Sequence, residues 1–240
     1  MNEKIREKNQ AILKKYFPNH LWPDEVYKNK IKSYISDGVR IGHLGCGRDL
    51  NRIYEVINGA KVFGIDFNLE SLKEYKTGER IRANLEKIPF RDKYFDLLIS
   101  EFVFEHIENP ENVINECKRI LKRNGKIIFL TINKFSLSGI TSSFTPQWFH
   151  KFVRRRMLEP QFYNDVFKTY YRFNSTGKIR KIFKDYNFKE VELKFLEAEI
   201  SYFDKFPALL ELGCIVNKFI MTTKMLQPFQ TYLLGIFEKE

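Results

Sequence analysis

The chain has 240 residues, of which 43% are hydrophobic and 30% are charged, and its formal net charge is +11 at pH 7. This composition is typical of a globular domain with a sizeable core, and it excludes a disordered chain and a small disulfide- or metal-dependent scaffold. The three scattered cysteines, Cys46, Cys117 and Cys214, have neither CxxC nor Cys/His spacing. We therefore expect reduced thiols of a cytoplasmic protein and no metal site.

The charge pattern and the late apolar segment limit the class of partner. The charged amino terminus lacks the apolar core of a signal peptide, and no uncharged run is long enough to cross a bilayer. Segment 206–226 is apolar but interrupted by Glu211, Lys218 and Lys224, which fits a buried amphipathic helix or, alternatively, peripheral membrane contact. The excess of Lys and Arg fits a solvated surface, or attraction to phosphate-bearing substrates or anionic lipid. No nucleic-acid motif accompanies it, so we expect no nucleic acid partner, and the oligomeric state stays open.

Strand-like and helix-like patterns alternate along the first half of the chain. Short apolar runs predict strands at residues 39–44, 60–66, 80–84, 95–100 and 125–133. Helical segments at 48–58 and 69–76 fill the first two connections. A third helix is predicted over 109–125, with Asn109 as N-cap, Pro110 in its first turn and Gly125 at its end. This alternation indicates an α/β domain with a mainly parallel sheet.

After residue 133 the pattern changes. Residues 134–147 are rich in Ser, Thr and Gly without periodicity, and an aromatic and basic segment continues to residue 174. A helix is then predicted over 175–187, a strand over 188–198 and a last strand over 231–240. The chain contains no internal repeat. The sequence therefore predicts an insertion at 134–174 between two parts with regular patterns.

The stretch "HLGCGRDLN", residues 43–51, places Gly45 and Gly47 between the first strand and the first helix. Glycines at this point let the backbone approach a ligand closely. Because Leu50 stands where a dinucleotide fold has its third glycine, NAD and FAD are disfavoured, and no P-loop motif is present. Asp66 ends the second strand, where a carboxylate can hold the two hydroxyls of a ribose or can cap the next turn.

Further motifs follow in order: "ANLEKIPF", "FDLLIS", "FEHIENP", "CKRILKRNG" and "FLTIN". Together with the glycine turn and Asp66, they resemble the class I S-adenosylmethionine-dependent methyltransferases (methyltransferase type 11-like) over residues 39–133. Three later segments, "TPQWFHKFVRRR", "DVFKTYYRFNSTGKIRKIF" and "FPALLELGCIVNKF", resemble a bacterial branch associated with glycan and polysaccharide modification.

The resemblance implies a Rossmann-like, mainly parallel seven-stranded sheet with an antiparallel last strand and helices on both faces. A helical and aromatic insertion would follow the fifth strand. One methyltransferase domain would then span residues 1–240: an N-terminal helical segment at 1–38, a cofactor-binding half at 39–133, an acceptor lid at 134–174 and C-terminal helices and strands at 175–240.

The resemblance also assigns S-adenosylmethionine as cofactor and S-adenosylhomocysteine as product, with no metal. The glycine turn would hold the methionine moiety, Asp66 the ribose and Phe67 the adenine face. The cofactor-binding set is His43, Gly45, Cys46, Gly47, Asp49, Asp66, Phe67, Asn84, Leu85, Glu101 and Phe102. Asn84 and Leu85 would contact the adenine edge, and Glu101 and Phe102 would border the transferred methyl group.

Three members of this set depart from the family pattern. His43 replaces an acid that helps to neutralise the cofactor's ammonium group, and a neutral imidazole supplies no charge. Asp49 replaces the third glycine of the turn, where its carboxylate can restore that charge or cap the next helix. Asn84 replaces a commoner aspartate. A non-catalytic binding protein with a degenerate pocket is therefore one alternative.

The acceptor side contains the candidate base. Methyl transfer to a hydroxyl needs a group that removes its proton, and His106 in "FEHIENP" is the first choice, with His150 second. Alternatively, Glu105 and His106 only hold the loop. The acceptor pocket is predicted to contain Trp148, His150, Tyr170, Tyr171 and Arg172. We expect O-methylation of a sugar or glycan intermediate or another small molecule, with C-methylation of a lipid quinone precursor as the alternative.

Overall fold

The computed structural model describes residues 3–48, 53–136, 167–197 and 205–240. Contacts divide the chain into two compact units. The sheet unit contains residues 24–132, 168–194 and 233–240, and the helical unit contains residues 1–23, 133–167 and 195–232. The domain boundaries expected from the sequence stay a prediction.

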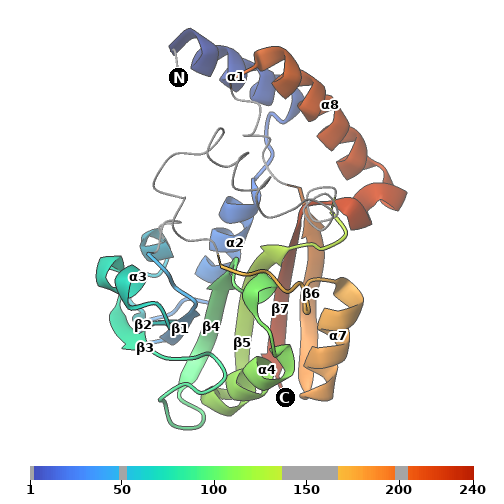
Figure 1. Ribbon diagram of the computed structural model, residues 1–240. Helices are drawn as coiled ribbons and strands as arrows, with labels where there is room; N and C mark the ends of the chain where they lie inside the picture. The colour runs from blue at the N-terminus through green and yellow to red at the C-terminus, as the bar shows by residue number, and fades with distance from the viewer. Residues whose placement is uncertain (1–2, 49–52, 137–166, 198–204) are drawn as a thin grey trace. The chain divides into compact units, whose positions relative to one another are not determined.

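A seven-stranded sheet with the strand order β3-β2-β1-β4-β5-β7-β6 forms the sheet unit (Figure 1). The neighbours β3-β2, β2-β1, β1-β4 and β4-β5 all pair in parallel, and the last strand is antiparallel, so the expected fold class is confirmed. The strands are β1 (Arg40–Leu44), β2 (Lys61–Asp66), β3 (Glu79–Arg82), β4 (Phe95–Glu101), β5 (Leu121–Ile132), β6 (Phe188–Leu196) and β7 (Tyr232–Lys239).

Short helices connect these strands. Asn68 caps α3 because its Oδ1 accepts hydrogen bonds from the backbone N–H groups of Glu70 and Ser71. In Figure 1, α4 and α7 lie side by side in front of the sheet, and Lys178 Nζ of α7 donates to Glu111 Oε1 of α4 at 3.0 Å. The helical elements of this unit are α2 (Pro23–Lys32), η1 (Ile53–Glu55), α3 (Leu69–Glu74), η2 (Phe104–His106), α4 (Pro110–Ile120) and α7 (Thr176–Asp185).

Two expectations about helices were wrong. The predicted helix 48–58 lies partly outside the described residues, and its described part forms only the single 3-10 turn η1. The helix predicted over 109–125 ends at Ile120, because Leu121 already pairs with Phe95 in the sheet. The start of this helix is as predicted, with Asn109 as the N-cap residue and Pro110 in the first turn. The Asn109 side chain makes no capping hydrogen bond, and its Nδ2 donates to Glu86 Oε1 at 3.0 Å.

The core of the sheet unit includes a cluster of phenylalanines. Phe129 of β5 stacks on Phe183 of α7 and on Phe237 of β7, and the rings of Phe183 and Phe237 lie 3.9 Å apart between centroids. Phe104 and Phe173 join the same cluster, and all five side chains are at most 1% exposed. Burial of these rings fixes the ends of β4 and β5, which carry candidate site residues.

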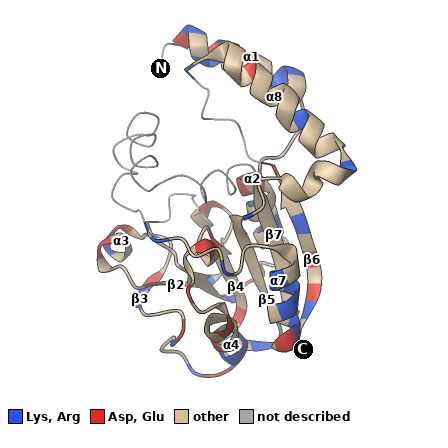
Figure 2. Ribbon diagram, turned by 45° about the vertical axis from the view of Figure 1, so that its right-hand side comes forward, with Lys and Arg blue, Asp and Glu red and all other residues tan. Residues whose placement is uncertain are grey.

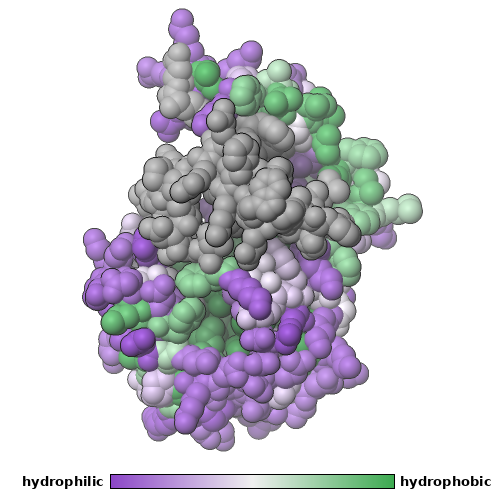
Figure 3. All heavy atoms as spheres, in the orientation of Figure 1, coloured by the Kyte–Doolittle hydropathy of each residue, from purple (hydrophilic) through white to green (hydrophobic). Residues whose placement is uncertain are grey.

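The helical unit contains α1 (Glu3–Tyr16), α8 (Pro207–Thr222) and the 3-10 helix η5 (Lys224–Phe229). Leu210 and Cys214 of α8 pack on Ile12 of α1. Charged residues are sparse along α8, as Figure 2 shows, and green apolar residues gather over it in Figure 3. Within the described ranges, no helix is both long and apolar enough to cross a membrane.

Candidate active site

The ends of four parallel strands bring the predicted cofactor residues to one edge of the sheet. Leu44 at the end of β1 pairs with Ile65 of β2 and with Ser100 of β4, so Gly45, Asp66 and Glu101 follow at the same level. Because ligands of open α/β sheets bind at the carboxyl ends of the strands, this edge is the expected place for a cofactor.

The glycine turn leaves β1 with both glycines in the left-handed region. Gly45 has φ +62 and donates its N–H to the carbonyl of Ile65 at 2.7 Å. A Cβ on Gly45 would lie 2.4 Å from Val103 Cγ2, whereas a Cβ on Gly47, at φ +50, would meet no atom within 4 Å. Gly45 is therefore required by packing inside the protein, and Gly47 faces open space.

Asp66 links the glycine turn to the end of β2. Its carboxylate accepts a hydrogen bond from Gly47 N–H at 2.9 Å and another from Asn68 N–H at 2.8 Å. Each carboxylate oxygen has a further lone pair, so the fixed group can still accept two ribose hydroxyls. Asp66 thus stabilises the following turn and also presents a carboxylate in the position expected for ribose.

An exposed aromatic ring lies next to this carboxylate in the sequence. Phe67 is 60% exposed, and its carbonyl accepts a hydrogen bond from Arg82 Nε at 3.3 Å. Asn84 is also exposed and its Oδ1 accepts from Glu86 N–H at 2.9 Å, while Leu85 is half-buried. The open space at Gly47, the Asp66 carboxylate and the Phe67 ring fit the sugar and base of a nucleoside.

His43 lies beneath the glycine turn rather than at the surface. It is buried, and its Nδ1 lies 3.3 Å from the Tyr75 hydroxyl. Burial lowers the pKa of His43 to about 4, so the imidazole is neutral at neutral pH. Tyr75 also packs with Cys46 and Leu72. The described contacts of His43 are thus structural, and its predicted role toward the cofactor stays a prediction. Asp49 lies outside the described residues.

The segment after β4 carries the candidate base. Phe102 has the unusual value φ +53, and its N–H donates to Leu130 O at 2.8 Å. His106 in η2 is half-buried, and its Nδ1 lies 3.0 Å from the carbonyl oxygen of Lys168. Since a carbonyl only accepts, Nδ1 carries the proton and the neutral ring has its lone pair on Nε2. This is the tautomer that a general base needs.

A buried polar chain lies beside the candidate base. Thr131 Oγ1 donates to Glu105 Oε2 at 2.8 Å, and Asn174 Nδ2 donates to Thr131 Oγ1 at 2.7 Å. Burial raises the pKa of Glu105 to about 7. The carbonyl of Glu105 also accepts from the N–H groups of Tyr170, at 2.8 Å, and Tyr171, at 3.2 Å. Glu105 therefore ties the His106 loop to β5 and to residues 168–174.

The same contacts bring three predicted acceptor residues next to the His106 loop. Tyr170 and Tyr171 follow Lys168, which accepts from His106, and Arg172 Nη1 donates to Glu108 O at 2.9 Å. The Arg172 guanidinium lies 5.5 Å from the centroid of the Tyr170 ring. The other two predicted acceptor residues, Trp148 and His150, lie outside the described residues.

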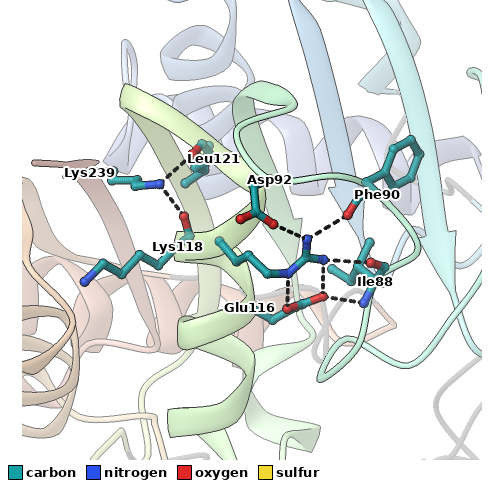
Figure 4. Close-up of polar contacts among 8 residues, drawn as sticks. Ile88, Phe90, Asp92, Glu116, Lys118, Leu121 and Lys239 are labelled. Carbon is teal, nitrogen blue, oxygen red and sulfur yellow. Dashed lines mark hydrogen bonds and ion pairs between the residues drawn. The ribbon is translucent and has the colours of Figure 1, made fainter.

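An arginine fixes the loop between the adenine-edge residues and β4 (Figure 4). The guanidinium of Arg119 donates to the carbonyls of Ile88 and Phe90 and to the carboxylates of Asp92 and Glu116, all within 2.9 Å. Glu116 Oε1 accepts in addition from Ile88 N–H at 2.6 Å, and the bonds from Arg119 hold the pKa of Glu116 below its usual value. Sequence patterns did not indicate this anchor.

Metal ligands do not gather in the described part of the chain, where no three His, Cys, Asp or Glu side chains could hold an ion together. The three cysteines are buried thiols.

Comparison with known proteins agrees with this geometry. The sequence profile of a methyltransferase domain family matches residues 43–129. The uncharacterized protein MJ1123 of Methanocaldococcus jannaschii is 30% identical over 180 residues, which cover 71% of this chain and 77% of that protein. The ubiquinone biosynthesis O-methyltransferase of Photobacterium profundum is 28% identical over 117 residues, covering 42% of this chain and 50% of that enzyme.

Solved structures show the same fold. A crystal structure of a SAM-dependent methyltransferase from Methanosarcina mazei superposes with a TM-score of 0.56 at 18% identity, covering 91% of this chain and 98% of that one. With the profile match and the geometry of the strand ends, these similarities show that the chain belongs to the class I S-adenosylmethionine-dependent methyltransferases and uses S-adenosylmethionine as its cofactor.

Proposed function

We propose that this methyltransferase transfers the methyl group to a hydroxyl of a small acceptor, with His106 as general base. The hydrogen bond from His106 Nδ1 to Lys168 O supports this role most directly, because it leaves the basic lone pair on Nε2. The preferred acceptor is a sugar or glycan intermediate.

Separate residues would bind the cofactor and activate the acceptor. Asp66 would hold the ribose hydroxyls, Phe67 would cover the adenine, and the main chain at Gly47 would border the methionine part. S-adenosylmethionine, when bound, supplies a methyl group already activated on a sulfonium. His106 Nε2 would take the proton of the acceptor hydroxyl while the attacking oxygen is held in line.

Residues 170–172 support a sugar as acceptor. The N–H groups of Tyr170 and Tyr171 donate to the carbonyl of Glu105, the residue before His106, so both tyrosines lie near the candidate base. Aromatic faces stack well on the apolar face of a sugar ring. Arg172, whose side chain is 53% exposed, could bind a phosphate or carboxylate on the acceptor. Trp148 and His150 remain proposed members of the same pocket.

A lipid quinone precursor is the second candidate acceptor, with methylation at carbon. The exposed apolar residues of α8 favour a lipid acceptor. The Photobacterium relative is named as a ubiquinone biosynthesis O-methyltransferase, which supports a quinone precursor as acceptor but not carbon as the methylated atom. Such an acceptor would be presented at a membrane, whereas a sugar intermediate requires no apolar surface.

The test is formation of S-adenosylhomocysteine by the purified protein with two acceptor panels. One panel contains sugars paired with their deoxy or pre-methylated analogues, and the other contains hydroxylated aromatic quinone precursors. Turnover with a sugar but not with its deoxy partner, lost in His106→Ala, supports the proposal. Turnover only with the aromatic panel, with the new methyl on carbon, supports the second candidate instead. Full turnover of His106→Ala would remove His106 from the mechanism.

A further inference from the structure

Helix α8 packs on α1 through one face only. Leu210 and Cys214 are fully buried on this face, and Ile220 is 7% exposed. Glu211 at its border accepts from Lys15 Nζ at 2.8 Å and from the Tyr16 hydroxyl at 3.0 Å. These contacts account for the core-facing half of the helix.

The other face of α8 is also apolar, and it is exposed. Leu209, Leu212, Val216 and Phe219 are spaced three and four residues apart and are 44–61% exposed. Ile215 lies beside them at 48% exposed, and Phe206 before the helix and Met225 after it extend the row, at 59% and 85%. In Figure 3, apolar residues, coloured green, gather over α8. We call these seven residues the α8 apolar face.

Such a face is unusual for a helix in contact with water. The side of a surface helix opposite its core contact normally carries polar residues. Contiguous apolar surface of this kind marks an interaction site. The helix has 16 residues, and among the described residues no helix qualifies as a membrane span. In contact with a membrane, α8 would therefore lie parallel to the surface with its apolar face inward, rather than cross the bilayer.

The charges around the α8 apolar face indicate which class of partner it binds. Lys205, Lys218 and Lys224 lie before, within and just after the helix. With α1 included, residues 3–16 and 205–229 carry eight Lys and Arg against three Asp and Glu, a net charge of +5. A second copy would bring a like-charged surface against this one, which is unfavourable. An anionic lipid surface combines an apolar interior with negative headgroups and satisfies both features.

We propose that α8 and η5 form a membrane-docking element that inserts the α8 apolar face into the interface of a bilayer containing anionic lipid. Lys205, Lys218 and Lys224 contact the headgroups. The inference does not rest on the proposed acceptor or on His106. It identifies the environment in which the enzyme works, and it applies to any acceptor held at a membrane.

Flotation with vesicles tests the proposal on the full chain. Vesicles of phosphatidylcholine alone are compared with an equal mixture of phosphatidylcholine and phosphatidylglycerol. We expect binding to the mixture, weak binding to phosphatidylcholine and weakening by salt. The double variant Leu212→Ser/Phe219→Ser should bind at least about 100-fold less tightly, since each deletion of a large buried apolar side chain costs about tenfold. Lys218→Ala/Lys224→Ala should lose about 25-fold, or about fivefold per lysine.

Controls separate docking from folding and from self-association. Val191→Ser removes an apolar side chain of similar exposure, 46%, on β6 and should leave vesicle binding unchanged. Each variant should keep the melting temperature and the S-adenosylmethionine affinity of the wild type. Absence of wild-type binding to the mixed vesicles would overturn the proposal. Equal binding by the Leu212→Ser/Phe219→Ser variant would do so too, as would a wild-type dimer in sedimentation that this variant dissociates.

Discussion

Alanine should act mainly on stability at Gly45 and mainly on cofactor binding at Gly47. Both positions have positive φ, so each substitution imposes a left-handed conformation that costs about 1–2 kcal/mol. At Gly45 the new Cβ would also lie 2.4 Å from Val103 Cγ2, and overpacking of this kind adds about 1–3 kcal/mol. Gly45→Ala should therefore destabilise the protein by about 2–5 kcal/mol, and Gly47→Ala by about 1–2 kcal/mol.

For cofactor binding, we expect the larger effect at Gly47 rather than at Gly45. A Cβ on Gly47 meets no protein atom within 4 Å and occupies the open space beside Asp66 where we place the cofactor. Gly47→Ala should thus weaken S-adenosylmethionine binding at least about tenfold for a modest loss of stability, since only glycine allows the closest approach of the backbone to a ligand.

Urea unfolding, thermal melting and calorimetry check this pair of variants. The melting temperature should fall by roughly 4–20 °C in Gly45→Ala and by roughly 2–8 °C in Gly47→Ala. In a Val103→Ala background only the Cβ of residue 103 remains close, at 3.2 Å, so the cost of Gly45→Ala should shrink toward the conformational part of about 1–2 kcal/mol. Equal losses at the two glycines, or no change in the Val103→Ala background, would refute the packing argument.

Three further predictions concern the acceptor side and the fold. His106→Ala should keep the wild-type cofactor affinity in calorimetry while its turnover falls at least about 100-fold. Burial raises the pKa of Glu105 to about 7, so the stabilisation from its protonated form is complete at acid pH and is lost as the pH rises through about 7. Neutral His43, whose pKa burial lowers to about 4, gains stability over the same range and offsets most of this loss in the wild type, so the wild type is compared with Glu105→Gln. In urea unfolding, the stability of the wild type relative to Glu105→Gln should fall by about 2.5 kcal/mol from pH 5 to pH 8; a pH-independent difference between the two proteins would contradict this. Arg119→Lys should cost about 2 kcal/mol in the same assay, because an ammonium cannot replace the forked contacts to Glu116 and two carbonyls, and a neutral result would show that the anchor is dispensable.

The sequence predicts the elements that local pattern controls. The strands around Gly45 and Asp66 lie where alternation and apolar runs indicated, and α3 begins at an Asn68 cap. The end of α4 was missed because Leu121 pairs with Phe95, a residue distant in sequence, and this pairing overrides the Gly125 stop signal. Local signals cannot report such pairings.

The candidate site was predictable to a similar extent. The positions of Gly45 and Asp66 follow from spacing, but the collision of a Gly45 Cβ with Val103 depends on the return of β4 beside β1. Sequence reasoning suggested that Glu105 could hold its loop, whereas its partners Thr131 and Asn174 lie far along the chain. A lone acid among the apolar residues of "FVFEHI" was the available signal for a buried carboxyl group.

Calorimetric titration tests the central claim most directly, namely that the glycine turn and Asp66 form an S-adenosylmethionine site. Wild-type protein is titrated with S-adenosylmethionine, S-adenosylhomocysteine and NAD, alongside Asp66→Asn. We predict micromolar binding of the first two ligands and no heat with NAD. Asp66→Asn should bind at least about tenfold less tightly, because an amide cannot form the charge-assisted bonds to two ribose hydroxyls. Absence of binding to the wild type, or unchanged affinity in Asp66→Asn, would contradict the account.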